Sequence, residues 1–198
     1  MAMACRPRQP GREPAHGRVG PGPERIGNSQ CRVIFLGIVA VPRRSALDWT
    51  LEAGSLGALL AIFGVVGSNW KDLPARVPRH FNALGNPDAW GGKNGLLLLP
   101  LTSLGIYILL TIASCYQKLI NIPMSVDRDA PEVQSLLLGM SILLKTIVLW
   151  MLLYIAWANV NTAMGRGAGL WKSFLPASLA AVVVPTALYM FKLRRYRN

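Results

Sequence analysis

Four long apolar segments constrain the fold of this chain more than any other feature. They cover about residues 47–67, 96–115, 136–160 and 170–191 of the 198. Each is close to the ~20 apolar residues that a helix needs to cross the hydrocarbon core of a bilayer. Inside a bilayer a single segment must satisfy its own backbone hydrogen bonds, and a helix does so. The sequence therefore predicts an all-α integral membrane protein with four transmembrane helices.

The composition agrees with a membrane protein. Hydrophobic residues make up 52% of the chain and charged residues 15%, whereas about 25% of an ordinary soluble domain is charged. The net charge is +12, and the eight arginines and two glutamates of residues 1–44 account for half of it. Basic residues that flank apolar spans indicate topology. We therefore expect the lipid bilayer as a partner and no nucleic acid.

The domain organisation follows from the contrast between the basic N-terminal segment and the apolar spans that come after it. Residues 1–32 are rich in Arg, Pro and Gly and show no apolar periodicity, so they cannot bury enough surface to fold alone. Residues 33–41 are an apolar run that is too short to span a bilayer, and we interpret it as an interfacial or loosely docked segment. We predict a mostly disordered basic tail over residues 1–44, which leaves open a passive tail, a lipid-binding tail or a transit peptide. Residues 45–198 form the predicted four-helix domain.

The polar interval of residues 69–95, between the first two spans, is predicted to be ordered. Pro74 and Pro78 fix their own φ and favour an extended backbone in the residues before them. The run 85–88 has the composition of a turn, and the glycine pair 91–92 permits positive φ. Trp90 and two other large rings, Trp70 and Phe81, favour the membrane–water interface. We expect a compact cap on the membrane surface.

A family resemblance rests on this interval. It contains Leu73-Pro74, then Pro78, then the run His80-Phe81-Asn82, with Trp90-Gly91 following. This Leu-Pro-x-x-x-Pro-x-His-Phe-Asn pattern resembles the N-terminal domain, of unknown function, of the sporulation-delaying-protein immunity (SdpI) membrane family. The resemblance covers about residues 51–115. It implies a small multi-span domain whose role is immunity to, or sensing of, a toxic or antimicrobial peptide.

Six side chains of the interval are candidate ligand-binding groups. His80, Asn82 and Asp88 can hydrogen-bond a polar or peptide ligand, and Trp90 adds an aromatic surface. Arg76 and Arg79 are three positions apart and can form a small anion-binding pair. The alternative for His80 is a structural role, as a hydrogen-bonded histidine that binds no ligand.

Lys145 is the one charged residue of the third span, close to its middle. An ammonium group at mid-bilayer costs about 2.5–3.5 kcal/mol on insertion scales, so it should face the bundle and find a partner. Glu52 and Asp48, in the first turns of the first span, are the nearest candidates. Two roles remain open: a buried pair that fixes helix packing, or a site for a proton, an ion or a ligand.

No enzyme signature occurs in the chain. The sequence lacks the nucleophile-elbow, zinc-protease and phosphate-loop patterns, and His80 has no companion at a metal-binding spacing. We therefore predict no catalytic residue, no metal and no cofactor.

The expected function is that of a non-enzymatic protein of the cell membrane. Arg43 and Arg44 precede the first span and a basic tail follows the last one, which places both termini in the cytoplasm and residues 69–95 outside. A peptide ligand bound by this outer loop is the leading hypothesis. The alternative is a small transporter, or an accessory subunit bound to a partner membrane protein.

Overall fold

A computed structural model describes residues 44–116, 126–127 and 130–196 of the chain. The predicted disordered tail, apart from Arg44, lies outside the described residues. The helices and strands follow in the order α1 (Ala46–Ser68), β1 (Arg76–Phe81), β2 (Pro87–Gly92), α2 (Leu98–Cys115), α3 (Pro131–Ala163) and α4 (Phe174–Leu193). Two short 3-10 helices, η1 (Lys93–Leu97) and η3 (Arg194–Tyr196), precede α2 and follow α4.

The four predicted helices are confirmed. Within the described residues, four helices are long and apolar enough to cross a membrane, and the chain is therefore a multi-pass membrane protein. The helix bounds differ from the predicted spans mainly at two places. The third helix begins at Pro131 rather than near residue 136, and the fourth begins at Phe174 rather than near residue 170.

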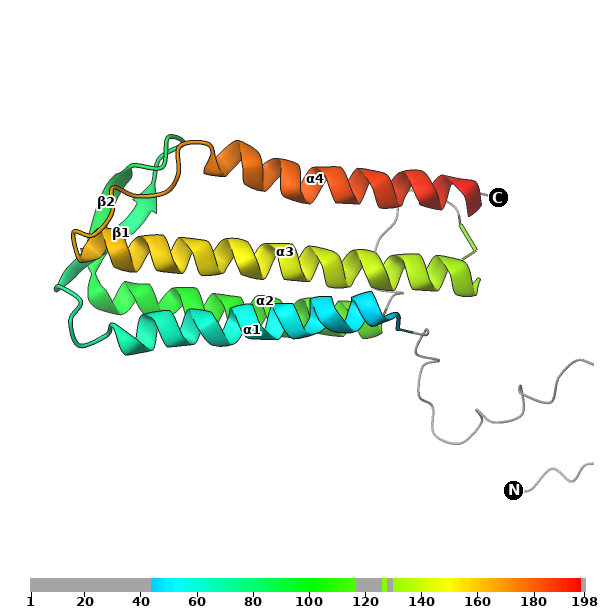
Figure 1. Cartoon of the computed structure of the whole chain (residues 1–198), viewed down its shortest axis with the longest axis horizontal. Helices are drawn as coiled ribbons and strands as arrows, with labels where there is room; N and C mark the ends of the chain where they lie inside the picture. The colour runs from blue at the N-terminus through cyan, green and yellow to red at the C-terminus, as the bar shows by residue number, and fades with distance from the viewer. Residues whose placement is uncertain (1–43, 117–125, 128–129, 197–198) are drawn as a thin grey trace, which may run out of the picture. The chain divides into compact units, whose positions relative to one another are not determined.

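The central helix of the bundle is α3. It packs against α1, α2 and α4, whereas α4 has no extensive contact with α1 or α2. Figure 1 shows α3 between α4 on one side and α1 with α2 on the other. Half of the most apolar window of α3 is buried, compared with none of that of α4. The other three helices therefore turn most of their apolar surface outward, as lipid-facing helices do.

The first and third helices begin with recognisable N-terminal signals. Ser45 caps α1: the Asp48 amide donates to Ser45 Oγ over 3.1 Å, and the Ser45 amide donates to Asp48 Oδ2 over 2.7 Å. Such a capping box satisfies two free N–H groups and contributes about 1 kcal/mol. Pro131 occupies the first turn of α3, where its missing N–H costs nothing.

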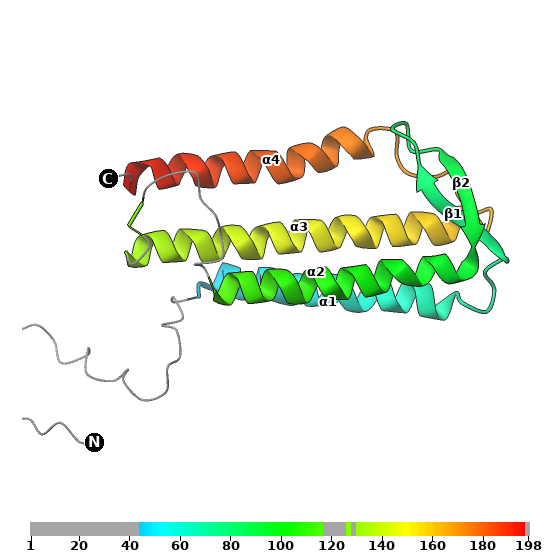
Figure 2. The same cartoon turned by 180° about the vertical axis from the view of Figure 1, so that it is seen from behind.

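Residues 76–92 form a β-hairpin, here called the cap hairpin. Strands β1 and β2 pair antiparallel, with Val77 opposite Gly91 and His80 opposite Ala89, and the register shifts on either side of His80. Val77 is buried and packs with Val66 of α1 and Val160 of α3. The reverse view shows the cap hairpin closing one end of the bundle (Figure 2). The order predicted for residues 69–95 thus takes the form of a hairpin that packs on helix ends.

The opposite end of the bundle holds the start of α1 and the end of α4, and there α3 and α4 extend beyond α1 and α2 (Figures 1 and 2). With 33 residues and a rise of about 1.5 Å per residue, α3 exceeds the ~30 Å hydrocarbon core. Its first turns pack against Leu193 at the end of α4 through Val133 and Leu137. Helix α3 is therefore longer than one crossing of the core requires, and its first turns pack against the end of α4.

Candidate functional site

The cap hairpin is tied to the helices by hydrogen bonds as well as by apolar contacts. Asn159 of α3 donates from Nδ2 to the carbonyl of Pro78 over 3.1 Å, in a buried position. Lys93 Nζ donates to the carbonyl of Leu73 over 3.2 Å and lies 4.9 Å from the centre of the Trp70 ring. The first contact joins β1 to α3, and the other two join the segments on either side of the hairpin to each other, so the hairpin is held in place and can support a binding surface.

The hairpin turn differs from the prediction, and Asn82 explains the difference. The Gly85 amide donates to the carbonyl of Asn82, so the turn covers residues 82–85, while Pro87 and Asp88 belong to β2. The Oδ1 atom of Asn82 accepts from the amides of Leu84 and Asn86, each over 3.0 Å. An asparagine that holds its own turn in this way has a structural role. The side-chain oxygen of Asn82 therefore stabilises the turn.

The tip of the turn docks on the loop between α3 and α4. Leu170 donates from its amide to the carbonyl of Gly85 over 2.8 Å. Gly85 and Gly169 have φ of 82° and 121°, a region that favours glycine. A Cβ atom on Gly85 would lie 2.3 Å from the Leu170 carbonyl oxygen, and one on Gly169 would lie 2.2 Å from that of Gly85. This close backbone contact involves the loop between α3 and α4, at the residues where the fourth span was predicted to begin.

His80 and Asp88 form a pair on the exposed side of the hairpin. His80 Nδ1 lies 2.6 Å from Asp88 Oδ1, and the side chains are 68% and 43% exposed. Trp90 lies two residues after Asp88 and is also exposed. We call His80, Asp88 and Trp90 the exposed rim. The structure thus brings together three of the six candidate residues on a surface that an outside ligand can reach.

Only one of the two arginines of the predicted anion-binding pair lines a groove in the described structure. Arg79 lines a groove beneath the hairpin, whereas Arg76 is exposed and does not line it. The side chain of Arg79 passes over Gly91, where a Cβ atom would lie 1.9 Å from Arg79 Cδ. Positive φ was expected at Gly91 and Gly92, but neither has it. A side chain at position 91 would therefore require the Arg79 side chain to move.

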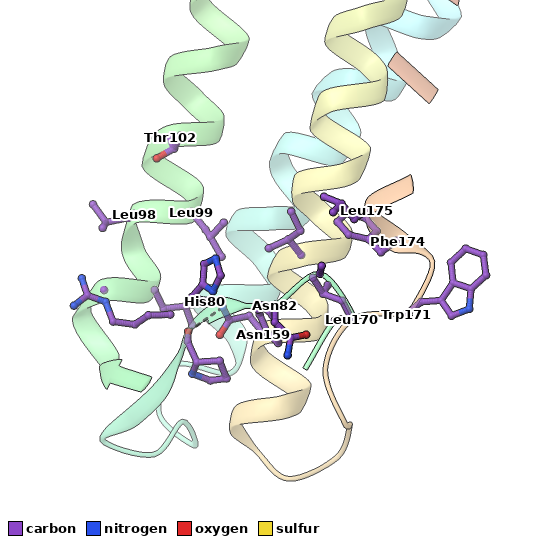
Figure 3. Close-up of a pocket in the computed structure, with 18 residues that line it drawn as sticks. His80, Asn82, Leu98, Leu99, Thr102, Asn159, Leu170, Trp171, Phe174 and Leu175 are labelled. Atoms are coloured by element: carbon purple, nitrogen blue, oxygen red, sulfur yellow. Dashed lines mark hydrogen bonds between the residues drawn. The ribbon is translucent and has the colours of Figure 1, made fainter. Parts of the chain in front are cut away.

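A groove of about 480 Å³ lies beneath the cap hairpin, and we call it the lateral groove. Figure 3 shows its residues, with α2 on one side, α3 at the back and the start of α4 on the other side. Its apolar walls come from the three helices and the loop before α4: Leu98, Leu99, Ile155, Leu170, Phe174 and Leu175. Its polar groups are Arg79, His80, Asn82, Thr102 and Asn159. The groove is therefore apolar along the helices and polar beneath the hairpin.

Asn159 leaves one polar atom of the groove without a partner. The residue is 6% exposed, and its Oδ1 atom accepts no hydrogen bond from the described residues. The hydrogen bond from Nδ2 to the Pro78 carbonyl fixes the orientation of the Asn159 amide. Exchanging Oδ1 and Nδ2 would place two acceptor oxygens against each other. A buried acceptor without a donor costs about 1–3 kcal/mol. A donor that enters the groove would remove this cost.

Lys145 pairs with Glu52, as the sequence predicted. Its Nζ atom lies 2.6 Å from Glu52 Oε2 and the lysine side chain is fully buried. Nζ also donates to Thr111 Oγ1 over 3.0 Å and lies 4.8 Å from the centre of the Tyr107 ring. Arg44 Nη1 approaches the other carboxylate oxygen of Glu52 at 3.8 Å. The ammonium group is thus enclosed by groups from α1 and α2.

Asp48, the second candidate partner of Lys145, has another role: its side chain completes the capping box with Ser45 at the start of α1. Among the described residues, no cluster of three or more His, Cys, Asp or Glu side chains is placed to hold a metal ion.

Asn159 and Gly169 were missed by sequence reasoning. A polar amide at the end of an apolar span was a usable signal for Asn159. Gly169 had no such signal, because its contact partner Gly85 lies far away in the chain.

Comparison with known protein families gives one match, and it covers the cap hairpin and the adjoining parts of α1 and α2. Residues 56–104 match the family described as Domain of unknown function (DUF1648). The matched segment contains most of α1, the cap hairpin and the start of α2, and it excludes Lys145 and Asn159. No curated protein and no solved structure matches the chain.

Proposed function

We propose that this chain is a non-enzymatic protein of the cell membrane that binds a peptide at the exposed rim of the cap hairpin. The observation that carries the proposal is the anchored hairpin, which presents the His80–Asp88 pair beside an exposed Trp90. Aromatic side chains are enriched where proteins bind other chains. A preorganised surface also loses less entropy on binding than a flexible loop.

A role in immunity or sensing is the finer form of this proposal. It rests on the resemblance of residues 51–115 to the SdpI family, and the DUF1648 match at residues 56–104 falls within the same segment. Under this proposal the ligand is a toxic or antimicrobial peptide that reaches the membrane from outside. Binding at the rim would hold it away from the bilayer.

The proposed topology places the cap hairpin outside and both termini in the cytoplasm. Arg44 lies just before α1, and Lys192, Arg194 and Arg195 lie at the end of α4. Basic residues next to membrane spans favour the cytoplasmic side. The same rule weighs against the proposal at the hairpin end, which carries Lys71, Arg76, Arg79 and Lys93, so the sidedness needs a direct measurement.

Growth assays test the proposed function. A bacterial host that expresses the chain is exposed to a panel of membrane-active peptides, and we expect several-fold protection against at least one of them. Trp90→Ala and Asp88→Asn should abolish the protection, since they remove the aromatic surface and the charge of the rim. Lys71→Ala is the matched control, because Lys71 is exposed at the same end of the bundle but lies outside the hairpin strands.

The result that contradicts the proposal is protection by none of the peptides, or protection that survives both rim substitutions at normal expression. Expression is measured in the same cells with a tag, so that loss of the protein is separated from loss of binding.

A second function is favoured by the buried charge. The Lys145–Glu52 pair is a costly feature inside a membrane bundle, and intramembrane charges frequently mark ion or proton pathways. A small transporter would use this pair for flux, and an accessory subunit would use the outward faces of the helices to bind a partner. Flux measured in vesicles and co-purification at a fixed ratio separate these two roles from peptide binding.

A further inference from the structure

The lateral groove opens toward the lipid rather than toward water alone. Leu98 of α2 and Leu175 of α4 both line it, and both are more than half exposed. No extensive contact joins α2 to α4, so the gap between their first turns has α3 at its back and the cap hairpin at its end (Figure 3). In a bilayer, the neighbours of such a gap are acyl chains.

The polar end of the groove offers one cation and one acceptor. The guanidinium group of Arg79 forms no ion pair with another described residue, and the side chain lies along the groove over Gly91 and Gly95. Asn159 is 6% exposed, and its Oδ1 atom accepts no hydrogen bond from the part of the chain that the structure describes. A matching ligand therefore has an anion, a hydrogen-bond donor and an apolar tail.

We propose that the lateral groove binds one anionic glycerophospholipid from the leaflet on the hairpin side. Its phosphate pairs with Arg79, a hydroxyl of its headgroup donates to Asn159 Oδ1, and an acyl chain lies between α2 and α4 against Ile155 and Phe174. Phosphatidylglycerol has all three of these features, whereas phosphatidylcholine has no headgroup donor and no net charge. His80 belongs to both the groove and the exposed rim, but the lipid contacts fall on Arg79 and Asn159 and the proposed peptide contacts on Trp90 and Asp88, so each proposal can fail without the other.

Native mass spectrometry of the full chain in detergent tests the lipid site. The protein is titrated with phosphatidylglycerol and with phosphatidylcholine of identical acyl chains, and bound lipids are counted at each concentration. We expect one phosphatidylglycerol to bind roughly tenfold more tightly than phosphatidylcholine, the scale of one charge-assisted hydrogen bond. The further lipids should bind without headgroup preference, as general contacts with the helix surface do.

Two substitutions with matched controls locate the lipid. Arg79→Gln should remove the tenfold preference, whereas Arg76→Gln, an exposed position of the same strand outside the groove, should keep it. Thr102→Trp fills the groove and should prevent binding of the tight lipid. Leu109→Trp adds the same ring two turns further along α2, on a lipid-facing position outside the groove lining, and should leave the lipid bound.

The proposal is overturned if the unaltered chain shows no preference for phosphatidylglycerol, or if the preference survives Arg79→Gln or Thr102→Trp. It is also overturned if protein isolated from membranes carries a peptide in the groove in place of a lipid. Thermal unfolding of each variant in the same detergent serves as the folding check, and the preference is compared only among variants that unfold as the unaltered chain does.

Discussion

Lys145 is tolerated inside an apolar bundle because its charge has several nearby partners. Glu52 supplies the opposite charge at 2.6 Å, Thr111 accepts one N–H, and the Tyr107 ring faces the ammonium group. A buried pair seldom adds net stability, but removal of one member leaves an uncompensated charge. The loss should therefore depend on which member is removed.

Substitutions in this pair are predicted to show strong coupling. Glu52→Gln leaves the fully buried Lys145 without its counter-charge and should destabilise the bundle by about 3 kcal/mol or more. Lys145→Met should cost less, because Glu52 keeps Arg44 nearby at 3.8 Å. The double variant should be more stable than Glu52→Gln alone, since no unpaired charge remains. Unfolding in mixed micelles measures all three.

The matched control is Lys172→Met, which removes an exposed lysine of the loop before α4 and should change stability little. Additive losses in the double variant would contradict the proposed pairing. If the double variant folds and still protects cells or carries flux at the normal level, the pair is a packing element and has no role as an ion or proton site.

At the scale of elements, the cap hairpin depends on two glycines that lie far apart in the chain. Gly85 and Gly169 both have positive φ, and each approaches the other's loop so closely that a Cβ atom would meet a carbonyl oxygen. The contact joins the hairpin turn to the start of α4. It therefore helps to shape the hairpin side of the lateral groove.

Alanine at either glycine is predicted to loosen the cap hairpin. Gly85→Ala and Gly169→Ala should each destabilise the docked hairpin by about 1–3 kcal/mol, from backbone strain and displaced carbonyl contacts. Gly92→Ala is the matched control, because Gly92 has a φ of −64° and open space at its Cβ position. Hydrogen exchange of the hairpin amides measures the effect.

Faster exchange in residues 76–92, with α1 and α3 unchanged, is the expected pattern for both variants. Equal exchange in Gly85→Ala and Gly92→Ala would show that the hairpin does not need the contact with the α3–α4 loop.

At the scale of the whole molecule, the proposed topology predicts which end of the bundle faces the cytoplasm. The start of α1 and the end of α4 lie at one end, and the cap hairpin lies at the other. Basic residues occur at both ends, so the charge rule alone gives a narrow preference. A chemical measurement of sidedness is more decisive than a count of charges.

Single cysteines are predicted to report opposite sides of the membrane. In a chain whose Cys5, Cys31 and Cys115 are replaced by serine, Ala83→Cys at the hairpin turn should react with an impermeant maleimide in intact cells. Ala130→Cys, just before α3, should react only after the cells are opened. The reverse pattern would invert the proposed topology, and labelling of both positions in denatured protein controls for expression.

The main features of the fold were readable from particular residues. The long apolar segments predicted the helices, Pro131 marked the start of α3, and the isolated charge of Lys145 predicted a partner in the first turns of α1. These signals work because a bilayer penalises unpaired backbone and side-chain charges wherever they occur along the span. The Leu-Pro to His-Phe-Asn run likewise indicates an ordered segment, because its prolines restrict the backbone.

The candidate site could be predicted only in part. His80 and Asp88 were expected to share a surface, and they do. Asn82 was expected to bind ligand, yet its oxygen holds the turn, and Arg76 does not join Arg79 in the groove. The difference arises because turn position and strand register decide where a side chain points, and a shift of one residue exchanges the two faces of a strand.

Local chemistry therefore settled the membrane class, the helices and the need for a counter-charge, since each depends on the transfer of a segment or a group from water to lipid. The lateral groove, the free oxygen of Asn159 and the Gly85–Gly169 contact arise only when α2, α3, α4 and the hairpin pack together. Their partners lie tens of residues apart in the chain, where neither periodicity nor propensity carries information about distance in space.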